Sequence, residues 1–218
     1  MEHAGAVEPD TIFAASARER RGLADLLDDL RPAQLNTPSL CAGWSVRVVA
    51  GHLVAAVSPS KRPFLVELVR RRGNAQAAND ALARRFGALP VDELSAALRR
   101  YAESRFAPPL VGARGPLTDA LVHGGDMRVP LDIPHAPDPE HVRPALEFVT
   151  TGRPIGFVRR GALRGLRLVA TDLDWTWGEG EPVEGRGIDL LMVACGRTAV
   201  LPKVTGAGST VLRNRLPA

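Results

Sequence analysis

Three residues of this chain could together bind a metal ion: His52, Asp119 and His123. Asp119 and His123 are four residues apart, so on a helix they lie one turn apart on the same face, while His52 must come from a different helix. Two imidazoles and one carboxylate suit zinc, iron, nickel or manganese, and the ligand types alone do not choose among them. Three protein ligands leave coordination positions open for water or a substrate. The spacing alone leaves open the alternative that the two histidines are unrelated and bind no common metal.

Helical patterns surround all three candidate ligands. Residues 10–30 alternate apolar and polar side chains with a period near 3.6, which predicts a first helix. A second helix is predicted to begin near Ser45, to carry His52 and to be stopped by Pro59. Residues 116–131 form a further helical segment that carries the other two ligands. Each candidate ligand is therefore expected inside a helix rather than in a loop.

The remaining segments predict a helical part followed by a mixed part. Residues 61–106 are rich in helix formers and fit two or three helices, whereas residues 131–139 have the proline and aspartate content of a linker or lid. Beyond them we expect strands at 166–171, 175–177 and 210–212 and a short apolar helix over 188–197. The sequence thus predicts a two-domain α+β protein, with a helical domain over 1–140 and a small α+β domain over 141–218.

Composition narrows the class of protein. The chain is 45% hydrophobic and 24% charged, as is ordinary for a globular protein, and it has no apolar run of about 18 residues that could span a membrane. Its start lacks the basic and apolar regions of a secretory signal, so we expect a cytoplasmic protein whose Cys41 and Cys195 are free thiols. The net charge of +4 comes from scattered arginines without interleaved aromatics, so no nucleic-acid partner is predicted.

Two residues near the candidate ligands need separate consideration. Asp126 lies three residues after His123 and shares its helix face, so it could hydrogen-bond the ligand histidine or pair with an arginine such as Arg47. Cys41 precedes His52 by eleven residues. That separation would be roughly 16 Å along a continuous helix, so we expect Cys41 to be a buried small hydrophobe and not a ligand.

The segment LCAGWSVRVVAGHL, residues 40–53, resembles the signature of the DinB-like, mycothiol-dependent maleylpyruvate isomerase family. In that family a Gly-Trp-Thr/Ser-Val-Arg run begins the second helix, and a metal-binding histidine follows the tryptophan by eight residues, as His52 does here. A second family signature has a glutamate, a histidine four residues later and an aspartate three further on, and it is similar to Asp119, His123 and Asp126. Residues 188–197 resemble the apolar helix ending in Gly-Arg of the family's C-terminal domain.

This resemblance implies a fold and an activity. The fold is an N-terminal DinB-like four-helix bundle that binds a divalent metal, with zinc the first choice, followed by a small α+β domain. Family members use the low-molecular-weight thiol mycothiol as cosubstrate, so the partners expected here are that thiol and a small electrophile. The activity would be isomerisation or S-transfer. Arg197, in the Gly-Arg context, is the expected contact for a substrate carboxylate.

Two departures from the family pattern keep a second hypothesis open. Asp119 is one methylene shorter than the family's glutamate, and Gly124-Gly125 directly after His123 costs about 1 kcal/mol of helix propensity per glycine. Both features favour a non-catalytic protein that kept the bundle fold with a degraded metal site and binds a small or lipid-like ligand. The sequence does not identify the electrophile, the oligomeric state or the residues that act in catalysis beyond the metal ligands.

Overall fold

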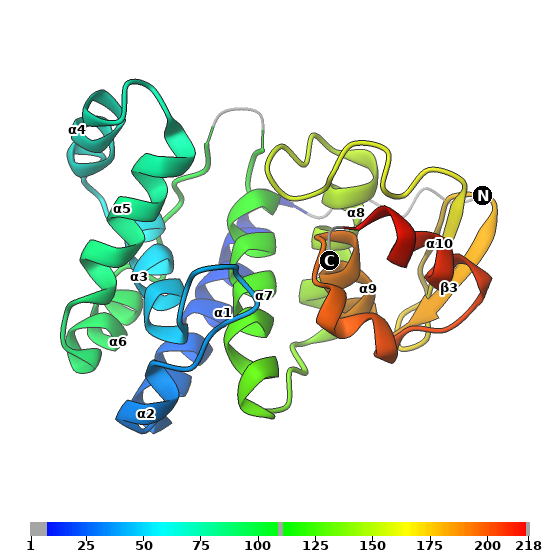
Figure 1. Cartoon of the computed structure of the whole chain (residues 1–218), viewed down its shortest axis with the longest axis horizontal. Helices are drawn as coiled ribbons and strands as arrows, with labels where there is room; N and C mark the ends of the chain where they lie inside the picture. The colour runs from blue at the N-terminus through cyan, green and yellow to red at the C-terminus, as the bar shows by residue number, and fades with distance from the viewer. Residues whose placement is uncertain (1–7, 109–110, 217–218) are drawn as a thin grey trace. The chain divides into compact units, whose positions relative to one another are not determined.

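The structure, a computed structural model, describes residues 8–108 and 111–216 and is mainly helical (Figure 1). It divides into two compact units. Of the described residues, one unit holds 13–106 and 123–134, and the other holds 8–12, 107–108, 111–122 and 135–216. Helix α7 contributes residues to both units, so the predicted domain division at residue 140 stays a prediction. None of the described helices is long and apolar enough to cross a membrane.

The unit that begins at Phe13 is built from helices. In chain order its helices are α1 (Pro9–Asp29), α2 (Pro32–Leu35), α3 (Val46–Val57), α4 (Arg62–Arg70), α5 (Ala75–Gly87) and α6 (Val91–Arg100). The predicted first and second helices are therefore present, and three helices occupy the segment 61–106. The unit is held together by buried apolar faces, because α1 buries Leu23 and Leu27 and α6 buries Leu94 and Leu98.

A glycine pair brings α3 and α5 unusually close together. A Cβ atom added at Gly51 would lie 2.3 Å from both the carbonyl oxygen of Ala83 and the backbone nitrogen of Gly87. A Cβ at Gly87 would in turn lie 3.0 Å from the Arg47 carbonyl oxygen. Only residues without a Cβ permit this backbone contact. The contact sets the position of His52, the residue that follows Gly51.

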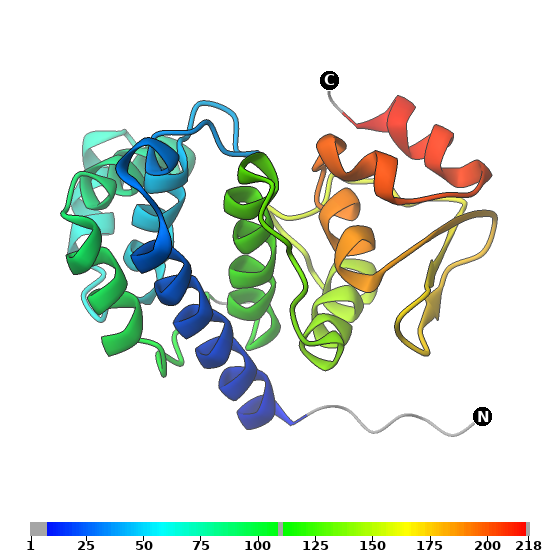
Figure 2. The same ribbon diagram turned by 90° about the horizontal axis from the view of Figure 1, so that it is seen from below.

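The second unit has the mixed character that the sequence predicts. It contains the first part of α7 (Arg114–Arg128), then α8 (Pro139–Thr151), β1 (Leu166–Ala170), β2 (Thr176–Trp177), β3 (Glu181–Gly185), α9 (Gly187–Ala194), the 3₁₀ helix η2 (Thr198–Lys203) and α10 (Ala207–Arg215). Its sheet has the order β2-β1-β3, with β1 antiparallel to β2 and parallel to β3. Helix α9 is buried along its whole length and packs against α8, β1 and β3 (Figure 2). This is the predicted α+β arrangement.

The predicted strand at 210–212 is wrong, because these residues lie within α10. The three-residue run Thr-Val-Leu has high β propensity, but burial here recurs with a spacing of four: Gly208, Leu212 and Leu216 are buried while Val211 is only half-buried. Gly208 also allows the helix to approach β3 closely, since a Cβ there would lie 2.6 Å from the Glu181 carbonyl oxygen. Tertiary packing on the sheet outweighs the local propensity.

Candidate metal centre

His52 lies in the middle of α3 and is oriented by α5. Its Nδ1 is 3.1 Å from Oδ1 of Asn79. An amide oxygen can only accept a hydrogen bond, so Nδ1 carries the proton and the lone pair of the neutral ring is on Nε2. The Trp44 ring packs beside the imidazole, with 5.4 Å between ring centroids. Asn79 and Trp44 therefore hold His52 with Nε2 as the nitrogen able to bind a metal.

The position of Trp44 is fixed by a charged pair on α5. The indole Nε1 donates a hydrogen bond of 2.7 Å to Oδ1 of Asp80, and Arg84 Nε lies 3.1 Å from each oxygen of the same carboxylate. Arg84 also donates to the Gly43 carbonyl oxygen at 3.0 Å. The hydrogen bonds from Arg84 and then from Trp44 lower the pKa of Asp80 below its ordinary value.

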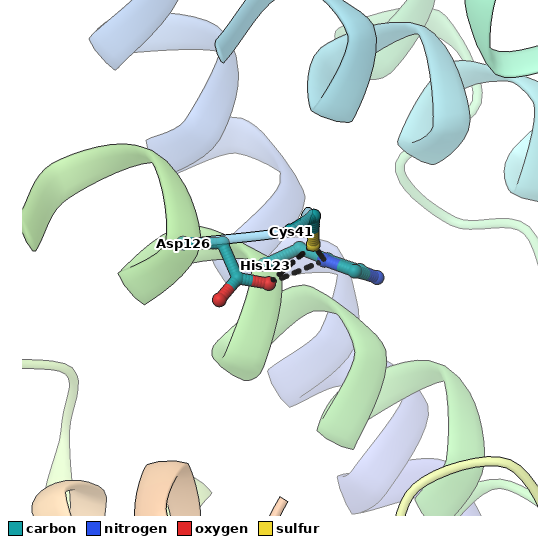
Figure 3. A group of neighbouring side chains, drawn as sticks. All are labelled: Cys41, His123 and Asp126. Carbon is teal, nitrogen blue, oxygen red and sulfur yellow. Dashed lines mark hydrogen bonds and ion pairs between the residues drawn. The ribbon is translucent and has the colours of Figure 1, made fainter. Parts of the chain in front are cut away.

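His123 lies on α7 and is oriented by Asp126, one turn later on the same helix. Its Nδ1 is 2.8 Å from Oδ2 of Asp126, whose side chain is fully buried, while the His123 side chain is 13% exposed. Asp126 makes the histidine contact and not the suggested pair with Arg47, which instead donates to the Leu89 carbonyl oxygen at 3.2 Å. A carboxylate on Nδ1 leaves Nε2 available for a metal, as is usual for histidine ligands. That second nitrogen points away from Asp126 (Figure 3).

The structure brings His52 and His123 together, and Asp119 joins them. The two imidazoles meet edge to face, with 4.8 Å between their centroids and 72° between their planes. Asp119 precedes His123 by one turn of the same helix, so the helix itself sets its position relative to that histidine. One ligand atom from each of His52, Asp119 and His123 lies within 4.8 Å of the others. The predicted set is close enough to converge on one ion.

Cys41 was expected to be a buried small hydrophobe, and this expectation is wrong, because the side chain is only half-buried and lies beside polar groups. Its Sγ is 3.1 Å from Oδ2 of Asp126 and 3.6 Å from Nδ1 of His123 (Figure 3). The distance estimate extended a helical rise back to Cys41, but the chain turns before α3. Gly43 has a φ of +76°, and Trp44 N donates to the Cys41 carbonyl oxygen. The glycine just before the helix was the sequence signal for this turn.

The turn that carries Cys41 is attached to α7. The backbone nitrogen of Leu40 donates to the carbonyl oxygen of Asp126 at 3.2 Å, and Ser39 Oγ accepts from the backbone nitrogen of Cys41 at 3.1 Å. Both bonds fix the backbone on the N-terminal side of the Cys41 side chain. Cys41, His123 and Asp126 consequently form a second group of potential ligand atoms within 4.8 Å of one another.

A comparison with known families identifies the chain. Residues 16–128 match the family model described as the mycothiol maleylpyruvate isomerase N-terminal domain. The chain belongs to the mycothiol maleylpyruvate isomerase family. The matched segment contains both groups of potential metal ligands. No curated protein sequence matches this family member significantly.

Solved structures share the fold of this maleylpyruvate isomerase family member. A crystal structure of the mycothiol-dependent maleylpyruvate isomerase superposes with a TM-score of 0.58 at 12% sequence identity, covering 96% of this chain and 97% of the other. A crystal structure of a histidine-to-alanine mutant of the isomerase gives a TM-score of 0.57 with the same identity and coverage. At this identity the likeness establishes the fold alone.

Arg197, the predicted substrate contact of this family member, follows α9. Its guanidinium Nη1 donates a hydrogen bond of 2.7 Å to the carbonyl oxygen of Cys195 at the C-terminal end of that helix. Such a bond satisfies a carbonyl that has no partner within the helix. The substrate-binding role of Arg197 stays a prediction.

Proposed function

We propose that this protein is a metal-dependent enzyme that uses mycothiol or a closely related low-molecular-weight thiol as cosubstrate and acts on a small electrophile as an isomerase or S-transferase. Membership of the mycothiol maleylpyruvate isomerase family supports the proposal, as do the similar folds of crystal structures of that isomerase. The observation that carries it is the convergence of His52, Asp119 and His123. We propose zinc as the metal.

The donor set fits a divalent metal. Both histidines use Nδ1 for a hydrogen bond to an oxygen acceptor, so each offers Nε2 as a ligand. Asp119 would supply negative charge that helps to offset the charge of the ion, and its ligand atom within 4.8 Å of those of both histidines supports a role for the shorter acid as a ligand. Substitution of an aspartate for the family's glutamate therefore does not by itself imply a degraded site.

The chemistry of the site divides between the metal and the chain. A zinc ion with three protein ligands leaves a coordination position open and lowers the pKa of a thiol or water bound there. Asn79 and Asp126 keep both imidazoles in the tautomer that presents Nε2. Trp44 covers one side of His52 and limits its rotation. These residues keep the ligand set organised before a thiol or an electrophile arrives.

The thiol cosubstrate accounts for both proposed reaction types. Its sulfur forms a bond to an electrophilic carbon of a conjugated system, and the displaced electron pair moves to the conjugated carbonyl oxygen. The former double bond can then rotate, and when the electron pair returns the carbon–sulfur bond breaks and the thiol leaves, which gives isomerisation without net consumption of thiol. If the adduct gains a proton on carbon instead and leaves, the outcome is S-transfer.

Metal content and thiol-dependent turnover measured on the same variants test the proposal. Purified protein should contain close to one zinc ion per chain by emission spectroscopy. His52→Ala and His123→Ala should lose both the metal and the thiol-dependent activity, while His141→Gln, on α8 and in neither ligand group, should lose neither. Metal-free protein with undiminished thiol-dependent turnover would refute the proposal. Ligand binding that requires neither metal nor thiol would favour the non-catalytic alternative.

A further inference from the structure

The group formed by Cys41, His123 and Asp126 has the dimensions of a metal site in its own right (Figure 3). Its atoms are separated by 3.1 Å (Sγ to Oδ2), 3.6 Å (Sγ to Nδ1) and 2.8 Å (Nδ1 to Oδ2). Around a tetrahedral zinc ion, bond lengths to sulfur, nitrogen and oxygen place such ligand atoms roughly 3.3 to 3.6 Å apart. Oδ2 would need to move roughly half an ångström away from both Nδ1 and Sγ to accommodate an ion.

The backbone of α7 and of the Cys41 turn holds the three residues together. Asp126 and His123 project from adjacent turns of α7, and the Cys41 turn is attached to that helix by the bond from Leu40 to the Asp126 carbonyl oxygen. Cys41 is half-buried and Asp126 is fully buried, so the group is shielded from most of the solvent that would compete for a bound ion. The ligand atoms thus form a cluster whose geometry the local backbone maintains.

We propose that Cys41, His123 and Asp126 form a second metal-binding site, selective for thiophilic cations such as Cd²⁺, that competes with the His52, Asp119 and His123 site for His123. Sulfur is the distinguishing ligand, because soft thiolates favour soft cations more strongly than imidazole and carboxylate do. Coordination replaces the thiol hydrogen of Cys41 by the metal, and the proton is released to solvent. The inference goes beyond the proposed enzyme function, since it uses two residues that the other ligand set does not.

Competition follows from the chemistry of His123. A neutral imidazole has one lone pair and one N–H group. With the proton on Nδ1 and bonded to Asp126, the lone pair on Nε2 serves the set with His52. When Nδ1 binds an ion beside Cys41, the proton moves to Nε2 and His123 is withdrawn from that set. A thiophilic cation should therefore displace zinc from the protein rather than bind in addition to it.

Cadmium titration followed by ultraviolet absorption tests the site directly, because sulfur-to-cadmium charge transfer reports thiolate coordination without any activity measurement. Wild-type protein should develop the band with one Cd²⁺ per chain. Cys41→Ser should lose the band and bind Cd²⁺ at least about tenfold more weakly, the lower limit of the effect of losing even an outer partner of a metal site. Cys195→Ala removes the only other cysteine and is the matched control, so it should keep the band.

Three further variants separate this site from the proposed catalytic one. His52→Ala should keep the cadmium band, whereas Asp126→Asn should weaken it and His123→Ala should abolish it. Zinc-loaded wild-type protein should release zinc as the band grows. A wild-type protein without the band, a band that survives Cys41→Ser, or a band that requires His52 would overturn the inference. A band that requires His52 would overturn the second site without contradicting the proposed function. Conversely, inactivity of metal-loaded protein would contradict the proposed function without affecting the cadmium result.

Discussion

Replacement of Gly51 by alanine should destabilise the protein, although alanine is the better helix former. A Cβ at Gly51 would lie 2.3 Å from the Ala83 carbonyl oxygen and the Gly87 nitrogen, both of which are backbone atoms that no side-chain rotation can move. Ordinary contact requires about 3.4 Å, so α3 and α5 must separate by roughly 1 Å. Overpacking of this kind costs about 1–3 kcal/mol, which exceeds the gain in helix propensity of about 1 kcal/mol in most of that range.

Gly22, on α1, is the matched control for this prediction. A Cβ there meets nothing within 4 Å, so Gly22→Ala should stabilise the protein by about 0.5–1 kcal/mol. In a protein of this size each kcal/mol shifts the melting temperature by about 2–4 °C, so the two variants should move it in opposite directions. Gly51→Ala should also weaken zinc binding, because the separation moves His52 away from Asn79. If Gly51→Ala melted above wild type and kept its zinc affinity, the close packing inferred for α3 and α5 would be refuted.

Three further predictions concern the site and its surroundings. Asp126→Asn should lower zinc affinity by about 10–100-fold in a competitive chelator assay while leaving the fold intact by circular dichroism, because a neutral amide orients His123 less strongly than a carboxylate. Asp119→Glu should retain zinc and Asp119→Ala should lose it; equal retention by both would remove Asp119 from the ligand set. Asp80→Asn should destabilise the protein above pH 3.8, because hydrogen bonds from Arg84 and Trp44 hold the pKa of this carboxyl below that ordinary value in the folded state. The difference in unfolding free energy between wild type and variant should diminish as the pH falls below 3.8 through the lowered pKa. Chemical unfolding at several pH values measures this difference, and a difference that stayed constant would contradict the prediction.

Local sequence patterns predicted the helices that carry His52, Asp119 and His123, but not the turn that brings Cys41 beside His123. The helix around His52 and the helical spacing of Asp119 and His123 follow from the local periodicity of residues three and four apart, which the sequence displays directly. Cys41 depends on a turn at Gly43 and on a backbone bond from Leu40 to α7, and such a long-range contact leaves no periodic signal. Arg197 offers no comparable pattern, since its hydrogen bond to the Cys195 carbonyl oxygen is local and its predicted role depends on the resemblance alone.

The glycines after His123 show how tertiary structure overrides a local penalty. Gly124 and Gly125 each lower the helix propensity of α7, yet the helix runs without interruption from Arg114 to Arg128 and both glycines are buried. The combined propensity cost of about 2 kcal/mol is small compared with the burial of the apolar residues on the same helix, among them Leu117, Leu121 and Met127. Packing of the helix therefore maintains the register between Asp119 and His123.

His123 belongs to both ligand groups, so the nitrogen that carries its proton decides which group can use it. Asp126 holds the proton on Nδ1 and so favours the set with His52, but the same carboxylate oxygen lies 3.1 Å from the Cys41 sulfur and is a ligand atom of the other set. Loss of Asp126 should consequently weaken both sites, whereas loss of Cys41 should weaken only the thiophilic one. With Cys41→Ser, zinc binding should become insensitive to added Cd²⁺ at concentrations that displace zinc from the wild type. Equal displacement in both proteins would mean that cadmium reaches His123 by a route that does not involve sulfur.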